Sequence, residues 1–356
     1  MVFIAGILIL AVLVYFIRPQ EKSDLPETYL VPEGLSRERL ERLGLHKASE
    51  DASYILDIHQ LSLPQPQNGS DAIRSHFNSK KDWVIELEQV RGDLLKKEDI
   101  KKVLDERWRS QFPSLLYGFS SSDHNWKWFY DESDTAPDDF SRLHLVVDMQ
   151  MLFEEKNGDF NPAYLEGYLT ELKKRFGKGR ESWKITPVEP VDRAISKAKE
   201  WTALYHELRY DALILLQKDK PYDGLQAWDA LLSLGLTWDD MDLFHWYGPE
   251  HDAPLFSVWT TTRPGYFLPE RIKDRSMNPG NLVFGFNVPI SVDPVNVYHI
   301  MLRAARYCQK RLGGQLYDKG ANPLNELQEK QLLSDHLRKM QARNIPAGSF
   351  EARELF

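Results

Sequence analysis

The sequence has little cysteine and lacks the short motifs that mark common catalytic sites. Cys308 is the single cysteine among 356 residues, which excludes an intramolecular disulfide and argues against a disulfide-stapled secreted scaffold. The patterns GxGxxG, GxxxxGKS/T, HExxH, CxxC and GxSxG do not occur in the chain. We therefore expect a non-enzymatic protein without a cofactor or a metal site, whose folded part lies in a reducing compartment.

An excess of positive charge is also missing. The formal net charge is −8, whereas a broad nucleic-acid surface needs clustered Lys and Arg, so we expect no nucleic-acid partner. Aromatic residues make up 12% of the chain, which is too rich for a disordered protein. The length exceeds one ordinary core and suggests about two domains.

One long apolar run stands at the N-terminus. Residues 1–17 carry no charged or strongly polar side chain and are just long enough for a thin bilayer core. No positive residue precedes the run and it does not end in small residues, so we predict an uncleaved transmembrane anchor over residues 1–18 instead of a signal peptide. Positive residues follow, beginning with Arg18 and Lys22. The positive-inside rule then places the N-terminus outside and the folded domains in the cytoplasm.

Two segments are expected to lack a packed fold. Residues 19–81 contain scattered proline and serine without a sustained apolar period, which is typical of a flexible tether. We expect at most one short helix in it, near residues 36–43. Residues 344–356 are predicted to be a disordered tail.

From residue 83 onward, strand and helix patterns become dense and occur twice. The order of elements over residues 82–209 returns over residues 210–343 at an offset of about 130 residues, which indicates an internal repeat. The first copy is predicted to contain strands 83–90, 115–119, 126–130, 142–149 and 183–188, and helices 96–108, 162–176 and 192–208. The second is predicted to contain strands 211–217, 241–246, 255–262, 282–288 and 315–317, and helices 223–234, 294–312 and 324–340. The predicted fold is therefore α+β: one transmembrane helix, then two tandem split β-α-β-type sandwiches, each a mainly antiparallel sheet with helices on one face.

Three groups of residues suggest chemistry, and each has a simpler explanation that we prefer. His245 and His251, with several acids nearby, suggest a metal or acid–base cluster, but a loop solvated by its acids explains them better. The aromatic strands, including Trp126 and Trp259, suggest a stacking platform for single-stranded RNA. Acidic charge and the missing basic–aromatic run argue against that platform. Asp318 has no identifiable partner in the sequence and is expected to be a turn residue.

The second copy resembles a known family through several landmarks that occur in the same order. They are the strand Ala212 to Leu215, Gly235 followed by residues 240–245, the run from Leu255 to Phe267 with Arg263-Pro264-Gly265, Asn287-Val288-Pro289, and Gly313-Gly314 leading to Asp318. Residues 210–343 thereby resemble the C-terminal FtsZ-binding domain of the ZipA family of membrane-anchored bacterial cell-division proteins. The predicted anchor, with its N-terminus outside, is similar to that family as well.

The resemblance implies a binding module in the bacterial inner membrane, with no catalytic role. In the family, one face of the sheet carries helices and the other is an open apolar groove that receives the C-terminal peptide of FtsZ as an amphipathic helix. Carried over by position, the partner-binding residues are Leu213, Leu215, Met241, Leu243, Thr261, Arg263 and Gly285, with Trp259 on the same strand face. The residues implied to point inward to the helices are Phe256, Val258, Leu282, Phe284 and Phe286.

Two positions depart from the family pattern. Thr261 stands where ZipA carries a methionine, and Gly285 stands where it carries a phenylalanine. Losing two large apolar anchors removes about 2–4 kcal/mol of binding by the usual cost of truncation. Trp259 is expected to refill part of the space.

These observations support three hypotheses. The leading one is a single-span protein that tethers FtsZ polymers to the inner membrane. The second keeps the tandem modules and gives them a different cytoplasmic protein partner. The third is a small-ligand or enzymatic cleft between the two copies, which needs a deep pocket with perturbed ionisable groups.

Overall fold

The computed structural model describes residues 33–56, 76–90, 94–131, 137, 139–155, 161–177, 183–248 and 253–356. The predicted anchor, residues 1–18, lies outside these ranges. Among the described residues, no helix combines the length and the apolar character needed to cross a bilayer. The chain divides into two compact units: a first unit over residues 69–207, and a second unit that combines residues 1–68 with residues 208–354.

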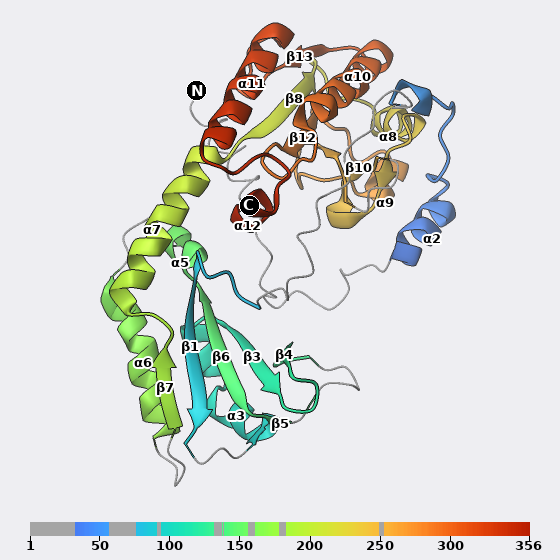
Figure 1. The fold of residues 1–356 in the computed structure, drawn as a ribbon. Helices are drawn as coiled ribbons and strands as arrows, with labels where there is room; N and C mark the ends of the chain where they lie inside the picture. Colours follow the sequence, from blue (N-terminus) through green and yellow to red (C-terminus); the bar gives the residue numbers. More distant parts are fainter. Residues whose placement is uncertain are drawn as a thin grey trace. The chain divides into compact units, whose positions relative to one another are not determined.

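The first unit is built on a five-stranded sheet in the order β4-β3-β6-β1-β7, in which all neighbours are antiparallel. Its strands are β1 (Asp82–Gln89), β3 (Leu115–Ser120), β4 (Asn125–Trp128), β6 (Arg142–Asp148) and β7 (Trp183–Pro187). A separate short pair joins β2 (Leu95–Lys96) to β5 (Asp139–Phe140). The helices are α3 (Lys97–Val103), α4 (Glu106–Gln111), α5 (Met149–Glu155), α6 (Pro162–Phe176) and α7 (Val191–Leu208) (Figure 1).

Every second side chain of β1 points into the core of the first unit. Trp83, Ile85 and Leu87 are fully buried in one cluster with Tyr168 of α6, as expected for a strand with one covered face. The helix predicted over residues 96–108 is instead two helices, α3 and α4. The break occurs because Asp105 adopts an extended backbone and its carboxylate accepts from the Trp108 N–H at 2.8 Å, which caps a new helix.

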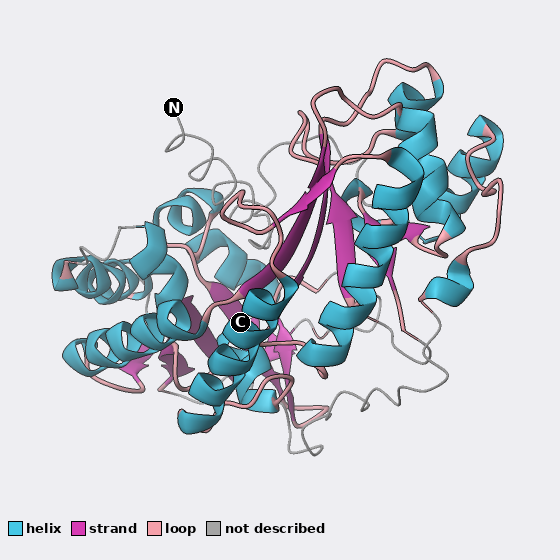
Figure 2. Cartoon of the chain, turned by 90° about the horizontal axis from the view of Figure 1, so that it is seen from above, coloured by secondary structure: helices cyan, strands magenta, loops and turns pink. Residues whose placement is uncertain are grey.

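The second unit has a six-stranded sheet in the order β13-β8-β12-β11-β10-β9, again antiparallel throughout. Its strands are β8 (Asp211–Gln217), β9 (Thr237–Trp238), β10 (Phe244–Trp246), β11 (Phe256–Trp259), β12 (Asn281–Asn287) and β13 (Gln315–Tyr317). Its helices are α2 (Glu33–Leu43), α8 (Gly224–Ser233), α9 (Pro269–Lys273), α10 (Pro294–Leu312), α11 (Glu326–Ala342) and α12 (Phe350–Leu355), with 3-10 turns at Ser53–Ile55 and Asp240–Asp242. Both units thus combine antiparallel sheets with helices, which confirms the α+β class (Figure 2).

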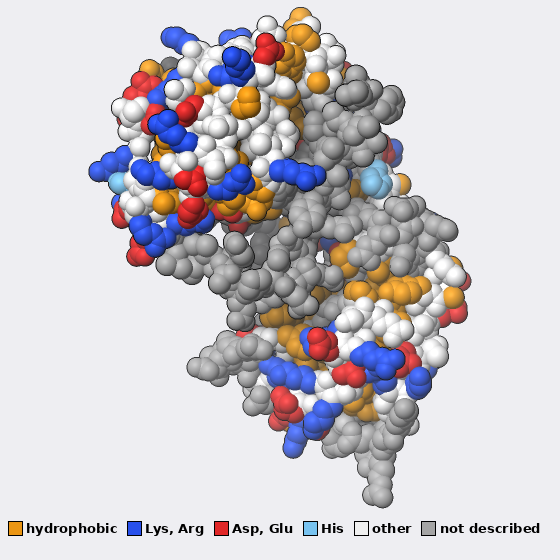
Figure 3. All heavy atoms as spheres, turned by 180° about the vertical axis from the view of Figure 1, so that it is seen from behind, with side chains coloured by type: hydrophobic (Ala, Val, Ile, Leu, Met, Phe, Trp, Pro, Cys, Tyr) orange, Lys and Arg blue, Asp and Glu red, His pale blue; other side chains and the backbone are white. Residues whose placement is uncertain are grey.

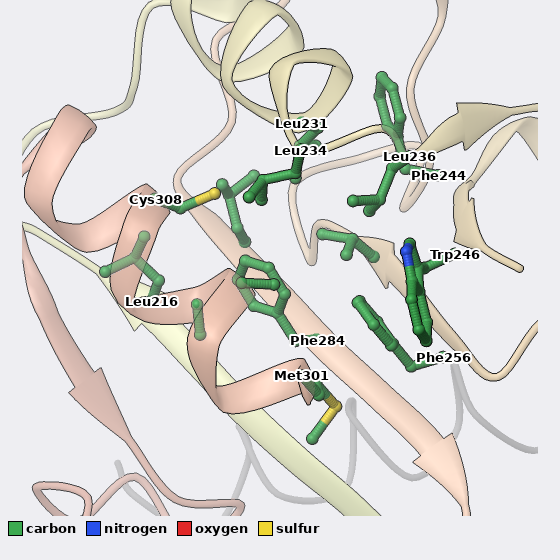
Figure 4. Packing of buried hydrophobic residues seen from close by; sticks show 14 of the residues in the cluster. Leu216, Leu231, Leu234, Leu236, Phe244, Trp246, Phe256, Phe284, Met301 and Cys308 are labelled. Carbon is green, nitrogen blue, oxygen red and sulfur yellow. The ribbon is translucent and has the colours of Figure 1, made fainter. Parts of the chain in front are cut away.

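The core of the second unit lies between the sheet and α8 and α10. Figure 4 shows Phe284 of β12 and Phe256 of β11 directed into this layer, together with Cys308 of α10. The five residues expected to face the helices are all in this core: Phe256, Val258, Leu282, Phe284 and Phe286. Cys308 is fully buried there, and burial raises the pKa of its thiol to about 12, so it packs as a small hydrophobe.

The two sheets share three neighbouring strands but differ at the adjoining hairpin. In each, the first long strand of the unit (β1 or β8) lies between the last strand and a long antiparallel partner (β6 or β12). In the first unit, the strand next to β6 is β3, which is the earlier strand of its hairpin. In the second unit, the strand next to β12 is β11, which is the later strand of its hairpin. The correspondence expected from the repeated element order therefore extends to the centre of the sheet and not to its hairpin edge.

The segment from residue 33 to residue 56, here called the N-terminal strap, differs from the flexible tether expected for it. Leu40, Leu45 and Leu56 are buried in the core of the second unit. The indole N–H of Trp228 donates to the Leu45 carbonyl at 3.0 Å, and the Ala52 N–H donates to the Ser233 carbonyl at 2.8 Å. Three well-spaced leucines and backbone hydrogen bonds hold this segment without a continuous apolar period.

The C-terminal tail also differs from the expected disorder. Ser349 caps α12 by accepting from the Ala352 N–H at 3.1 Å, and Ala352 is fully buried. The Gly348 N–H donates to the Pro289 carbonyl at 2.8 Å, which ties the tail to the second unit. The sequence signal for this helix is the serine cap followed by a short helix-forming run.

Candidate functional site

One face of the second unit's sheet is opposite the helices and is here called the open face, although Leu213 and Val283 on it are only 8% and 4% exposed. Leu213 and Leu215 of β8 lie on it, because they alternate with the core residues Ala212, Ile214 and Leu216. The register pairs Leu213 with Gly285 and Leu215 with Val283. Val283 therefore belongs to the same apolar surface, although the sequence reasoning missed it.

Trp259 and Gly285 occupy one space on this face. Trp259 of β11 pairs with Val283 of β12, two residues along from the Ser257–Gly285 pair on the same face. A Cβ atom added at Gly285 would lie 2.6 Å from Cη2 of the Trp259 indole and 2.5 Å from Cδ2 of Leu213. The indole and the leucine thus fill the volume that a larger side chain at position 285 would need, as expected from the sequence.

Met241 lies in a turn, not in the strand predicted over residues 241–246. It lies in the 3-10 turn Asp240–Asp242 with φ of 58° and is 44% exposed. The strand begins only at Phe244, after the buried Leu243. Acidic residues before β10 favour the turn, because the Asp239 carboxylate accepts from the Asp240 N–H at 2.7 Å and replaces a ladder hydrogen bond.

Thr261 and Arg263 lie beyond the end of β11, which corrects the strand predicted over residues 255–262. The chain leaves the sheet after Trp259 because polar groups compete with the ladder. The Asn281 side chain accepts from the Thr261 N–H at 2.8 Å and donates to its hydroxyl at 2.6 Å. The Thr262 hydroxyl accepts from the Gly280 N–H at 2.7 Å. Thr261 and Arg263 are both exposed.

The polar part of the open face is organised by His245. Its Nδ1 lies 2.8 Å from the Ser257 hydroxyl, and its Nε2 lies 2.9 Å from the Asp240 carbonyl oxygen. The same Nε2 is 3.4 Å from the Asp239 carboxylate, whose pKa is raised by burial against the opposing pull of His245. The second histidine of the sequence-predicted cluster, at position 251, lies outside the described residues. No group of three or more potential metal ligands is found in the described part of the chain.

The corresponding face of the first unit is partly covered by residues of the same unit, while Leu115 and Trp128 on it remain 52% and 51% exposed. The His76 ring stacks on Trp126 at 4.4 Å, and its Nε2 lies 2.7 Å from Nδ1 of His144. Trp126 also stacks on His144 at 3.8 Å, and Arg142 lies over the Phe119 ring at 5.0 Å. In the aromatic strand considered for base stacking, Trp126 thus packs against the unit's own imidazoles, whereas Trp128 is exposed. On the side of the molecule shown in Figure 3, basic and acidic side chains are interspersed.

The second unit's sheet, with its helices on one face and an apolar opposite face, can be set beside known proteins. Residues 212–335 match the family described as ZipA, C-terminal FtsZ-binding domain. The resemblance expected from the sequence is therefore confirmed for this segment. The match to the ZipA domain family includes every strand from β8 to β13 except the first residue of β8.

Whole-protein relatives are similar to this chain over a comparable length. A cell division protein ZipA of Shewanella loihica is 27% identical over 115 residues, which are 32% of this chain and 34% of the relative. A protein of the same name from Shewanella frigidimarina is 28% identical over 131 residues, 36% of each chain. One from Vibrio cholerae is 27% identical over 106 residues, 29% of this chain and 36% of the relative. The chain thus spans about a third of the length of these ZipA proteins.

Proposed function

We propose that the second unit is a non-enzymatic binding module of bacterial cell division, whose open face binds the C-terminal peptide of FtsZ. The match to the ZipA domain family supports this proposal, and so does the name shared by the relatives. The proposed partner-binding residues are Leu213, Leu215, Met241, Leu243, Trp259, Thr261, Arg263 and Gly285.

The observation that carries the proposal is the apolar surface on the side of the sheet away from the helices. Leu213, Leu215 and Val283 are neighbours in the ladder, and Trp259 extends the surface onto β11. An amphipathic peptide helix binds such a surface through a few apolar anchors. Met241, an exposed and unbranched side chain, adapts readily to a partner.

The remaining proposed positions lie at the margin of this surface. Arg263 is exposed, so it is available to attract an acidic group on the peptide and to raise the rate of encounter. Thr261 is hydrogen-bonded to the Asn281 side chain. We expect it to fix the backbone at the edge of the surface and to add little apolar area. Leu243 is nearly buried and supports the turn that carries Met241.

We further propose that residues 1–18 anchor the protein in the inner membrane with the N-terminus outside, so that both units, as tandem sandwiches, lie in the cytoplasm. Tethering would then hold FtsZ polymers at the membrane. Single grooves of this kind bind weakly. Confinement to a surface and the repeated sites of a polymer raise the effective affinity without a new contact.

A peptide titration tests the proposed site. The full chain, in nanodiscs and labelled at its methionine methyl groups, is titrated with the FtsZ C-terminal peptide and followed by NMR. The Met241 methyl signal should move, and Leu215→Ala should weaken binding. The matched control is Leu327→Ala, which truncates a leucine that is 80% exposed on α11 and should leave binding unchanged. If Met241 does not respond at millimolar peptide, FtsZ is not the partner of this face.

One observation favours a second candidate, a different cytoplasmic protein partner. The Trp259 indole fills the space over Gly285, where the ZipA pattern has a phenylalanine. The shape of the open face therefore differs from the one that the ZipA pattern implies. Recovery of another protein by the full chain, and loss of that recovery with the Trp259→Ala variant, would support this alternative.

A further inference from the structure

The turn that carries Met241 is held in a costly backbone conformation. Met241 and Asp242 both have φ of 58°, and a non-glycine residue in the left-handed region costs about 1–2 kcal/mol. Two consecutive residues of this kind persist only where their surroundings determine the conformation, and such strain clusters at ligand clamps. The contacts around this turn therefore indicate what maintains it.

The first contact comes from the sheet. The Asp240 carbonyl can only accept, so Nε2 of His245 carries the proton and donates to it at 2.9 Å. Nδ1 lies 2.8 Å from the Ser257 hydroxyl on the neighbouring strand. His245 is only 5% exposed, so this connection from the open face to the turn is shielded from water.

The second contact comes from the N-terminal strap. Arg39 of α2 donates from Nε and Nη2 to the two carboxylate oxygens of Glu270, each at 2.7 Å. Its guanidinium lies 5.2 Å from the centre of the Trp238 ring, and its Nη1 is 3.8 Å from Oδ1 of Asp242. The Arg39 and Asp242 side chains are each 24% exposed. A bidentate, stacked arginine has a fixed position, so Arg39 presents a fixed positive charge to the turn.

The third contact is backbone: the Phe267 N–H donates to the Asp242 carbonyl at 2.9 Å. Asp242 is thus held at its side chain by the strap and at its carbonyl by the segment that follows β11. Burial raises the pKa of Asp242, and the ion pair with Arg39 opposes that shift. The carboxylate therefore depends on the strap for its charge partner.

We propose that Arg39 of the N-terminal strap is a positioning residue for the peptide-binding face, holding the Asp240–Asp242 turn so that Met241 is presented to the partner. The inference rests on the proposed function of that face. It makes the strap part of the binding domain, which begins before β8, so that a fragment over residues 210–343 lacks one support of its own site.

The test compares Arg39→Gln with Arg37→Gln in the full chain in nanodiscs. Arg37 lies on the same helix and pairs with Glu41, and its side chain is 84% exposed, so it is the matched control. Arg39→Gln should move or broaden the Met241 methyl signal, assigned by Met241→Leu, and should weaken FtsZ-peptide binding about fivefold, a typical coupling between neighbours. Arg37→Gln should change neither. The buried Met301 and Met340 report whether the core remains folded.

Two further variants keep the outcome decisive. If Arg39→Gln disturbs Met301, Glu270→Gln removes the carboxylate that fixes the guanidinium and should still move the Met241 signal. Unchanged Met241 and unchanged affinity in a folded variant would overturn the positioning role. If the wild-type chain does not bind the peptide, the proposed function fails on its own, and the Met241 signal still decides whether Arg39 holds the turn.

Discussion

Replacing Gly285 by alanine tests the packing of the open face. The new Cβ would lie 2.5 Å from Leu213 Cδ2 and 2.6 Å from Trp259 Cη2, well inside the roughly 3.5–4.0 Å at which carbon atoms pack best. Overpacking of this size costs about 1–3 kcal/mol. Alanine in place of glycine within a strand recovers about 0.5–1 kcal/mol. We therefore expect Gly285→Ala to destabilise the second unit by about 1–2 kcal/mol.

The cost should depend on Trp259. A leucine end can rotate away from the new methyl group, whereas the indole is rigid and is the larger obstacle. In a Trp259→Ala background, Gly285→Ala should therefore cost close to nothing. The double-mutant cycle should give a coupling free energy of about 1–2 kcal/mol, within the range for residues in contact.

Cys308 provides an assay that reports on the second unit alone. It is the single cysteine of the chain and is fully buried in that unit's core, so a thiol reagent labels it only when this core opens. Labelling rates in the regime of fast reclosing give the free energy of opening for each variant. The first unit contributes no signal.

Gly167→Ala serves as the control for this cycle. Its Cβ would make only an ordinary contact at 3.6 Å, with Phe112 in the first unit, so Cys308 labelling should not change. If Gly285→Ala costs the same with and without Trp259, the indole does not fill the space over Gly285 and the reasoning about the altered face is wrong.

Two further predictions concern pH and the strap. Burial lowers the pKa of His76 and His144 to about 4, so the first unit should lose stability as pH falls from the unfolded value near 6.5 towards 4. Asp82, whose burial raises its pKa to about 6, opposes this loss as pH falls from about 6 towards the ordinary value of 3.8. Hydrogen exchange of β1 and β6 amides measures both, and a steeper loss in His144→Phe than in the wild type would contradict the assignment. Trp228→Phe leaves the Leu45 carbonyl without its indole donor and should loosen the strap by about 1–3 kcal/mol; proteolysis within residues 44–56 should accelerate, and an unchanged rate would contradict the docked strap.

Sequence reasoning located elements best where periodicity and caps agreed. The bounds of α6 and α10 were predicted to the residue, because each begins with a proline after an Asn or Asp cap. A short apolar run likewise predicted the bounds of β8, although a run that is apolar on both faces does not distinguish its core face. Among the site residues, Leu213 and Leu215 came from the resemblance to the ZipA family, and Val283, which pairs with Leu215, was missed.

The sequence signal was insufficient where polar side chains replace backbone pairing. Thr261 fits an alternating strand, but its backbone N–H bonds to the Asn281 side chain, a partner distant in sequence. Met241 fits the start of β10, but the Asp239 carboxylate and His245 hold it in a turn. The helix expected near residues 36–43 is present as α2, but the docking of the strap was missed because Leu40 and Leu45 are too widely spaced to form a helical stripe. Each failure arises from tertiary contacts that local propensity does not contain.

A repeated order of elements does not imply a repeated function. Both units place a long strand at the centre of an antiparallel sheet with one face turned from the core. In the first unit, His76 stacks on Trp126 and bonds to His144 over that face. A partner would have to displace these contacts, each of which already satisfies a ring or an imidazole nitrogen. In the second unit the same face carries Leu213, which is nearly buried, and Leu215 and the Trp259 indole, which are half-buried. Exposure alone therefore does not distinguish the two faces, because Leu115 and Trp128 are exposed on the first and Leu213 and Val283 are nearly buried on the second. The proposed assignment of the peptide-binding face to the second unit rests on the ZipA domain match, and multivalency would then come from the polymer.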